Sequence, residues 1–420
     1  MIQKLSVEEW IKKNKKLLMF ILFAILAIRI TSYFTLFTKN VGLTRVVKIG
    51  LRFMVTAYSI HLFKVLSKRF KGEFKMEYIM ILPMFFYCAY LGMGLLSVYW
   101  TTDVGVTLLQ WAMTFESLIF CIYFFKLMAV YDCMYRDGKQ SYSALFAASN
   151  CIIGIVFIIG VFVDPGNFYR GTHGGTVHRL GGFIINPNEL GMLAVLGMVA
   201  VNMEFVNGGN KIWNGIVWGV CFAVLLLTQS RSSLGAWLMV TGYFVMVYGS
   251  YTLKAGMIAG VVLGGPVVLS TIVFKDGNVE EVMSMTGRLP FWRDLITDGL
   301  PRRPYIGMGF MRIDYHDYFD SIHAYAAKMT HNTFVQVIIN LGLIGAWICL
   351  WQMIYTFYAV YHSPNKDYQS VAATMLVPIM INSFTEFGIF GESNYGIMFY
   401  QIIIMMFTIR AVRIRPGPDP

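Results

Sequence analysis

The sequence has little charge for its length. Only 14% of its 420 residues are Asp, Glu, Lys or Arg, whereas 57% are hydrophobic, and the mean hydropathy is +0.59. A soluble domain carries about 25% charged and about 45–50% apolar residues. This chain therefore has too little polar surface to cover a water-soluble globule, which excludes a cytosolic enzyme and indicates a membrane protein.

The sequence also lacks the usual signatures of cross-linking and metal binding. Its six cysteines show no regular spacing and five of them lie in apolar runs, so neither a disulfide framework nor a zinc site is expected. No Asp-x-Asp, Walker or His-Glu-x-x-His motif occurs. The acidic run at 314–320 and the histidines His173 and His178 fit solvated loops better than a cation site. We therefore expect no metal and no cofactor.

Long apolar runs dominate what is present. A membrane-spanning helix needs about 20 apolar residues, and the sequence predicts about twelve such spans. The first run, from Leu17, exceeds a signal-peptide core and has no small-residue cleavage site after it, so it is expected to be retained. The predicted spans are 17–37, 43–65, 77–99, 108–130, 145–163, 189–206, 212–230, 232–249, 255–273, 331–360, 369–390 and 395–412.

The basic residues predict the orientation of these spans. Lys and Arg outnumber Asp and Glu by 34 to 23, giving a formal charge of +11, and they gather in alternate connections. Such loops are normally cytoplasmic, so the excess is a topology signal and only weak evidence for nucleic-acid binding. Both termini are then cytoplasmic, and the two longest connections, 164–188 and 274–330, lie outside.

The chain therefore divides by topology rather than into globular domains. The predicted parts are an N-terminal bundle of five spans (1–163), spans six to nine with a Gly-rich outer loop (164–273), a large extracytoplasmic loop (274–330), three C-terminal spans (331–412) and a cytoplasmic tail (413–420). The large loop holds five arginines, although translocated loops usually have few. An anionic ligand outside the membrane would explain them.

One candidate site precedes the sixth predicted span, and another lies between the seventh and the eighth. Arg179 begins a Gly-rich stretch that ends in Asn-Pro-Asn188, where Asn188 can cap the next helix; taken alone, this stretch is better explained as a plain helix start. Arg231 lies in Thr-Gln-Ser230-Arg-Ser-Ser, between two spans with almost no loop. The hydroxyls around its guanidinium resemble a small anion pocket, and snorkelling to the interface is the alternative.

Further candidates lie in and after the large loop. Arg288 and Arg293 stand in Gly-Arg-Leu-Pro-Phe-Trp-Arg, where a solvated surface role is the ordinary explanation. Gly307 and Gly309 are a weak phosphate-loop signal. His331 opens a long span at the membrane border, where it either completes the helix start or acts in catalysis. Of the two intramembrane acids, Glu386 lies nearer the outer end of a span than Glu116 does and is the stronger candidate.

These motifs together resemble the O-antigen ligase and polymerase superfamily over about residues 176–360. The resemblance rests on their order and placement more than on any single one. They are Gly-Phe-x-x-Asn-Pro-Asn (182–188), Thr-x-Ser-Arg-Ser (228–232), Gly-Arg-x-x-x-Trp (287–292), Pro-x-x-Gly-x-Gly (304–309) and His-Asn followed by Gly-x-x-Gly (331–345).

The resemblance implies an all-α polytopic bundle of the membrane glycosyltransferase type with one large extracytoplasmic loop. It also implies transfer of a glycan from undecaprenyl diphosphate to an acceptor sugar outside a bacterial cytoplasmic membrane. By motif position, Arg231 and Arg288 would grip the diphosphate and His331 would activate the acceptor hydroxyl. Arg179, Asn188, Ser230, Arg293 and Glu386 are the expected substrate-binding residues. The expected partners are the lipid-linked donor, a glycan acceptor, the bilayer, a flippase and a chain-length regulator, without nucleic acid.

Three alternatives remain open from the sequence. Polymerase and ligase share these motifs, and the absence of any feature specific for lipid A slightly favours a polymerase. A flippase or transporter of lipid-linked oligosaccharide suits twelve spans equally well, but transporters tend to show related halves and midplane charges. A structural or sensor membrane protein leaves the outer arginines unexplained.

Overall fold

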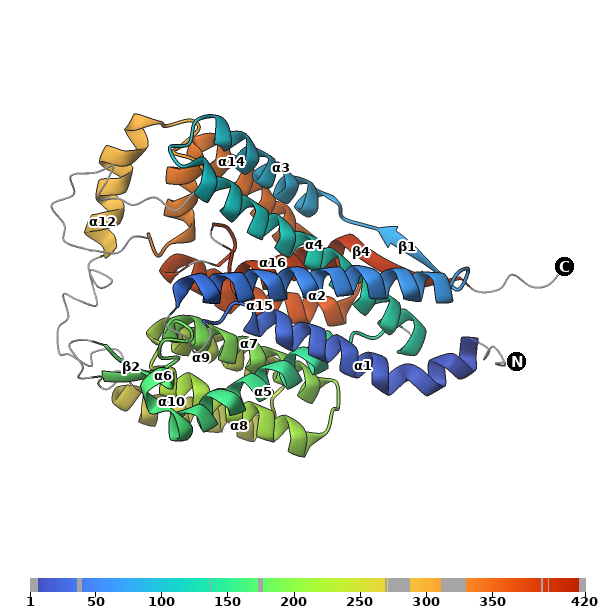
Figure 1. The fold of residues 1–420 in the computed structure, drawn as a ribbon. Helices are drawn as coiled ribbons and strands as arrows, with labels where there is room; N and C mark the ends of the chain where they lie inside the picture. Colours follow the sequence, from blue (N-terminus) through green and yellow to red (C-terminus); the bar gives the residue numbers. More distant parts are fainter. Residues whose placement is uncertain are drawn as a thin grey trace.

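The computed structural model describes residues 7–35, 40–136, 138–172, 177–268, 270, 288–310, 330–386, 388–391 and 393–414. In this part of the chain the fold is helical, with two short two-stranded sheets (Figure 1). The longer helices are α1 (Val7–Thr31), α2 (Val41–Arg69), α3 (Leu82–Leu96), α4 (Val104–Tyr135), α5 (Tyr142–Val163), α7 (Pro187–Val206), α8 (Lys211–Thr228), α9 (Arg231–Tyr248), α10 (Tyr251–Val268), α14 (Thr333–Tyr361), α15 (Lys366–Thr385) and α16 (Tyr395–Thr408).

Shorter elements connect these helices. They are η1 (Ser97–Tyr99), α6 (Pro165–Phe168), α12 (Arg288–Asp294), the π-helical turn η3 (Leu295–Gly299), η4 (Leu300–Arg302), β1 (Phe74–Tyr78), β2 (Tyr169–Thr172), β3 (Val177–Leu180) and β4 (Ile409–Arg413). Strands β2 and β3 form an antiparallel hairpin inside the connection predicted at 164–188. Of the large loop predicted at 274–330, the described residues are 288–310 and Thr330.

Every predicted span overlaps one of the longer helices. Among the described helices, seven are long and apolar enough to cross a membrane by length and composition: 42–69, 82–99, 104–135, 142–163, 187–206, 211–228 and 333–361. The polytopic helical class is thus supported, whereas the count of about twelve stays a prediction. One of the other helices, α16, has only 14 residues.

The helices run broadly along one axis, with distinct structures at the two ends (Figure 1). The start of α1 lies at the same end as the sheet in which β1 pairs with β4, where Phe74 is opposite Arg413. The β2–β3 hairpin and α12 lie at the other end. This arrangement agrees with the predicted placement of both termini on one side and the two long connections on the other.

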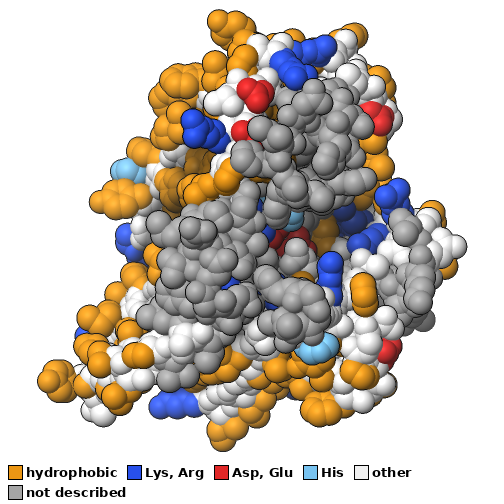
Figure 2. All heavy atoms as spheres, turned by 90° about the vertical axis from the view of Figure 1, so that its left-hand side faces the viewer, with side chains coloured by type: hydrophobic (Ala, Val, Ile, Leu, Met, Phe, Trp, Pro, Cys, Tyr) orange, Lys and Arg blue, Asp and Glu red, His pale blue; other side chains and the backbone are white. Residues whose placement is uncertain are grey.

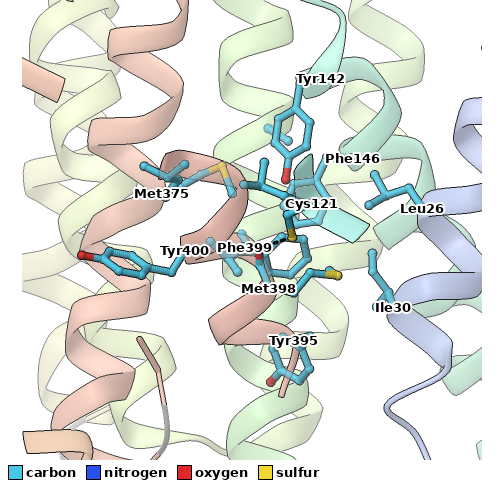
Figure 3. Close-up of a cluster of buried hydrophobic side chains, with 14 of the residues drawn as sticks. Leu26, Ile30, Cys121, Tyr142, Phe146, Met375, Tyr395, Met398, Phe399 and Tyr400 are labelled. Atoms are coloured by element: carbon cyan, nitrogen blue, oxygen red, sulfur yellow. Dashed lines mark hydrogen bonds between the residues drawn. The ribbon is translucent and has the colours of Figure 1, made fainter. Parts of the chain in front are cut away.

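Helix α16 forms the centre of the bundle. All 14 of its residues are buried. Figure 3 shows its Met398 and Phe399 among side chains such as Leu26 of α1, Cys121 of α4 and Phe146 of α5. A helix that is apolar all round is expected in such a position.

Helix α14 contains a break that the outer segment fills. Gly342 has φ 64° and ψ −165°, which interrupts the helix. The amides of Met308 and Gly309 donate to the carbonyls of Ile339 and Asn340 (2.9 and 2.8 Å), and Leu343 N donates to Pro304 O (2.8 Å). Backbone groups freed by the break are therefore satisfied, as burial requires.

Glycine makes this backbone contact possible. A Cβ on Gly342 would lie 2.3 Å from the carbonyl carbon of Tyr305, and one on Gly307 would lie 2.4 Å from that of Asn340. The Pro-x-x-Gly-x-Gly stretch and the first glycine of Gly-x-x-Gly thus form one joint, here called the α14 joint (residues 304–309 with 339–344). Gly307 and Gly309 therefore serve this packing.

Candidate functional site

Glu386 connects residues from three separate parts of the chain. It lies just beyond the end of α15 and is 3% exposed. Its Oε1 accepts from Asn188 Nδ2 at 2.9 Å and pairs with Arg288 Nη2 at 3.5 Å, and its Oε2 lies 2.6 Å from His331 Nδ1. The structure therefore brings three of the predicted site residues to the carboxylate of a fourth, Glu386.

Asn188 links this carboxylate to Arg179. The predicted capping role of Asn188 was wrong: Asn186 is the N-cap of α7, and its side chain accepts from Asn188 N. This leaves the Asn188 side chain free to bridge, with Oδ1 accepting from Arg179 Nη2 at 2.6 Å. Arg179 also donates from Nε to Thr228 O at 2.9 Å, so the β3 strand is held against the α8–α9 turn.

The charges around Arg179 favour an anion. The pKa of Arg179 is lowered to about 10, chiefly by burial; the charge of Glu386 acts to raise the pKa, and the charges of Arg231 and Arg170 act to lower it. Arg231 is thus close enough for its charge to be felt at Arg179. A bound anion would relieve both the repulsion between these cations and the loss of hydration.

The turn between α8 and α9 presents Arg231. Gln229 adopts a left-handed conformation (φ 49°) that ends α8, and Ser230 caps α9. Ser230 is 1% exposed, and its Oγ lies 2.8 Å from Ser233 Oγ. The predicted ring of hydroxyls therefore has a local structural use, and Ser230 is too buried to be presented to a ligand. Arg231, the half-buried first residue of α9, stands at a helix N-terminus, where anions are favoured.

Helix α12 presents Arg288 but not Arg293. Arg288 donates from Nη1 to Thr385 O, next to Glu386. Phe291 packs with Val335 and Ile339 of α14, which fixes α12 against that helix. Arg293 is exposed, and five residues turn it about 140° around the helix from Arg288. The structure therefore separates Arg293 from the site.

His331 is held in an unusual backbone conformation beside Glu386. Its φ is 47°, in the left-handed region that non-glycine residues rarely occupy. Asn332 follows as the N-cap of α14 and accepts from Phe334 N (2.9 Å) and Val335 N (3.1 Å). Such local strain is typical of functional positions, where surrounding contacts maintain it. The side chain of His331 is 20% exposed.

The environment keeps Glu386 ionised. Burial disfavours the ionised carboxylate, but the hydrogen bonds from His331 and Asn188 and the ion pair with Arg288 stabilise it. An ionised carboxylate accepts the Nδ1 proton of His331, which leaves Nε2 as the basic nitrogen.

This end of the molecule is hollowed. Figure 2 shows acidic side chains at the base of a depression, with Lys and Arg side chains around it. Among the described residues, no group of three or more His, Cys, Asp or Glu side chains is placed to hold a metal. His173 and the run at 314–320 lie outside the described residues.

The second intramembrane acid, Glu116, lies in a separate buried cluster. Arg29 contacts it twice, with Nη1–Oε1 at 2.7 Å and Nη2–Oε2 at 2.9 Å, and Arg52 Nη2 lies 3.2 Å from Oε2. Glu116 was a candidate from the sequence, whereas neither arginine was predicted to contact it. An arginine inside each of the first two predicted spans was the available signal.

A helical membrane bundle with arginines, a carboxylate and a histidine around a hollow at one end defines a polytopic membrane protein with a candidate anion site. Residues 216–350 match a protein-family model described as O-Antigen ligase. The exopolysaccharide production protein ExoQ of Rhizobium meliloti (strain 1021) is 24% identical over 273 residues, which cover 58% of this chain and 62% of that relative. The chain thus spans less than two thirds of the curated relative it matches.

These matches confirm the resemblance to the O-antigen ligase and polymerase superfamily. The family segment contains Arg231, Arg288 and His331, whereas Arg179, Asn188 and Glu386 lie outside it. The similarity is thus to a family described as O-Antigen ligase and to an exopolysaccharide production protein.

Proposed function

We propose that the protein transfers a glycan from undecaprenyl diphosphate to a sugar hydroxyl, and that it polymerises repeat units of a surface polysaccharide. The observation that carries the proposal is the convergence of Arg288, Asn188 and His331 on the buried Glu386 carboxylate. The setting is a bacterial cytoplasmic membrane, with about twelve spans, both termini in the cytoplasm and the reaction outside.

The arginines bind the diphosphate of the donor. Arg179, Arg231 and Arg288 stand at the same end of the bundle, on β3, α9 and α12. Guanidinium groups can make paired hydrogen bonds to phosphate oxygens, and they stabilise the charge that develops on a leaving diphosphate. This chemistry uses no metal, and we expect the reaction to be metal-independent.

His331 acts as the general base. The acceptor hydroxyl gives its proton to Nε2 as its oxygen bonds to the anomeric carbon, and the bond from that carbon to the diphosphate oxygen breaks. Undecaprenyl diphosphate leaves with the bonding electron pair, and the single displacement inverts the anomeric centre. Glu386 orients the imidazole through Nδ1 and stabilises the imidazolium that forms, as a carboxylate does behind a catalytic histidine.

A ligase that attaches finished polymer to a lipid A core would use the same groups. The printed name of the relative, an exopolysaccharide production protein, favours polymerisation. A flippase is the candidate from another class, and the gathering of the predicted residues at one end of the bundle speaks against it.

The test uses substitutions of the proposed groups in cells. His331→Ala and Arg231→Ala, present in the membrane at normal levels, should lose polymer and accumulate single lipid-linked repeat units. Arg293→Ala, which changes an exposed arginine on the other side of α12, is the matched control and should keep normal polymer. Normal chain length from both site variants would remove the catalytic assignment, and loss of activity in chelator that magnesium restores would overturn metal independence.

A further inference from the structure

A buried ionic cluster lies in the bundle apart from the proposed site. It consists of Arg29 of α1, Arg52 and Thr56 of α2, and Glu116 of α4, and is called the Glu116 cluster here. Arg29 is 0% exposed and its guanidinium carbon lies 4.6 Å from the ring centre of Phe120. Two arginines face one glutamate, and Thr56 Oγ1 also donates to that carboxylate.

Burying such a cluster adds little to the stability of the fold, which indicates that the cluster has a functional role. Burying ions is expensive, and replacing a buried ion pair by well-packed apolar residues is often neutral or stabilising. Ionisable residues inside a membrane bundle are accordingly rare and mark functional features. The use of this cluster follows from the other contacts of Arg52 Nη2, the nitrogen that also pairs with Glu116.

Arg52 reaches the connection between α15 and α16. Its Nη2 donates to Ser393 Oγ and to Met113 O, both at 2.8 Å. Ser393 lies at one end of this connection, and Glu386 lies at the other. Between them, Gly388 N donates to Thr333 Oγ1 and Gly391 N donates to Tyr90 OH, each at 2.9 Å.

The connection is therefore anchored from three helices, α14, α3 and α2. It has little slack, because a Cβ on Gly388 would lie 1.9 Å from Ser383 Oγ, and Gly391 has φ 103°. The anchor on α2 is the one made by an arginine, whose rigid fork fixes direction as well as distance. Glu116 contacts that guanidinium in turn, and Arg29 pairs with the same carboxylate.

We propose that the Glu116 cluster positions the α15–α16 connection and thereby the Glu386 carboxylate, so that Arg52 and Ser393 are positioning residues for the reaction. The inference rests on the proposed function, in which Glu386 orients His331. Arg52 and Ser393 act through Glu386 and touch neither substrate. Misplacement of a catalytic group by about 1 Å can slow a reaction about 100-fold.

The experiment compares kcat and KM in proteoliposomes. The donor is undecaprenyl-diphosphate-linked repeat unit extracted from cells of the source organism that lack this protein. Ser393→Ala removes the hydrogen bonds of this hydroxyl to Arg52 and to Met113 O without touching the ion pairs, and Arg52→Met removes the anchor itself. Both should lower kcat about 10- to 100-fold with the KM for donor within about twofold, because the arginines proposed to bind diphosphate are unchanged. Ser393→Thr, which keeps the hydroxyl, should restore most of kcat.

Val55→Ala is the matched control for general loosening of α2. Val55 is buried on the same helix and contributes only packing to the core. A fall in kcat for Val55→Ala equal to that for Ser393→Ala and Arg52→Met would overturn the positioning role, as would activity of both anchor variants within twofold of wild type. If His331→Ala instead retains full activity, the proposed function fails, and the positioning inference fails with it. If His331→Ala loses activity while Ser393→Ala and Arg52→Met keep it, only the positioning inference is refuted.

Discussion

Replacing Glu386 by Gln should disable the proposed base while keeping the shape of the site. A glutamine has the same size, and its carbonyl oxygen can still accept from Asn188 Nδ2, 2.9 Å away in the wild type. Its amide nitrogen, however, is a donor. Placed 2.6 Å from His331 Nδ1, it would stabilise the tautomer with the proton on Nε2, which cannot accept a proton from the acceptor hydroxyl.

The size of the effect follows from the roles that are lost. General base catalysis contributes about 10²–10⁴-fold in rate, which corresponds to about 3–5 kcal/mol of transition-state stabilisation. The buried carboxylate also balances the charge of Arg288, 3.5 Å away. We therefore expect kcat to fall at least about 100-fold, with a smaller change in the KM for donor because the arginines stay in place.

The assay is polymer formation in proteoliposomes, with membrane insertion checked by solubility in mild detergent. Glu204→Gln is a suitable control, because Glu204 is a half-buried carboxylate on α7 that contacts Ser143 rather than the site residues. A Glu386→Gln variant with kcat within about threefold of the control would refute the assignment of His331 and Glu386 as a catalytic pair.

Further predictions concern the α14 joint, the arginines and acid stability. Gly342→Ala should destabilise the protein by about 2–3 kcal/mol, since its φ is 64° and the new Cβ would meet Tyr305; an unchanged Tm in detergent would contradict the joint. Arg179→Met should raise the KM for donor about 10- to 100-fold, and an unchanged KM would exclude Arg179 from diphosphate binding. The ion pair between Glu386 and Arg288 needs an ionised carboxylate, so its contribution to stability is present at neutral pH and is lost when acid protonates Glu386. The Tm advantage of wild type over Glu386→Gln should therefore shrink in acid, and an advantage that grows there would refute this sign.

Apolar runs predicted the helices well but not their ends. A helix along the bundle needs a long apolar stretch, so each predicted span overlaps a helix. The ends of a helix depend on its capping residues, which are harder to recognise in the sequence than an apolar run is. Asn186 and Asn188 flank the same proline, and only the backbone conformation shows that Asn186 is the cap.

The site was predictable where its residues begin elements and less so where tertiary contacts decide. Arg231 and Arg288 each start a helix, and His331 directly precedes the cap of another, so motif order placed them at one end. The sequence could not show that Arg293 lies away from the other site residues, because the direction of a side chain depends on the helix that carries it. The contacts of Arg29 and Arg52 with Glu116 join three helices, and no local sequence pattern predicts contacts between residues so far apart in the chain.

The complete burial of α16 has a consequence for biogenesis. At about 1.5 Å per residue its 14 residues extend only about 21 Å, less than the roughly 30 Å hydrocarbon core of a bilayer. Helix α16 is therefore a poor candidate for independent partitioning into lipid. It would insert among neighbouring helices that have already assembled. Maturation of the Glu386 carboxylate's surroundings would then coincide with this late insertion step.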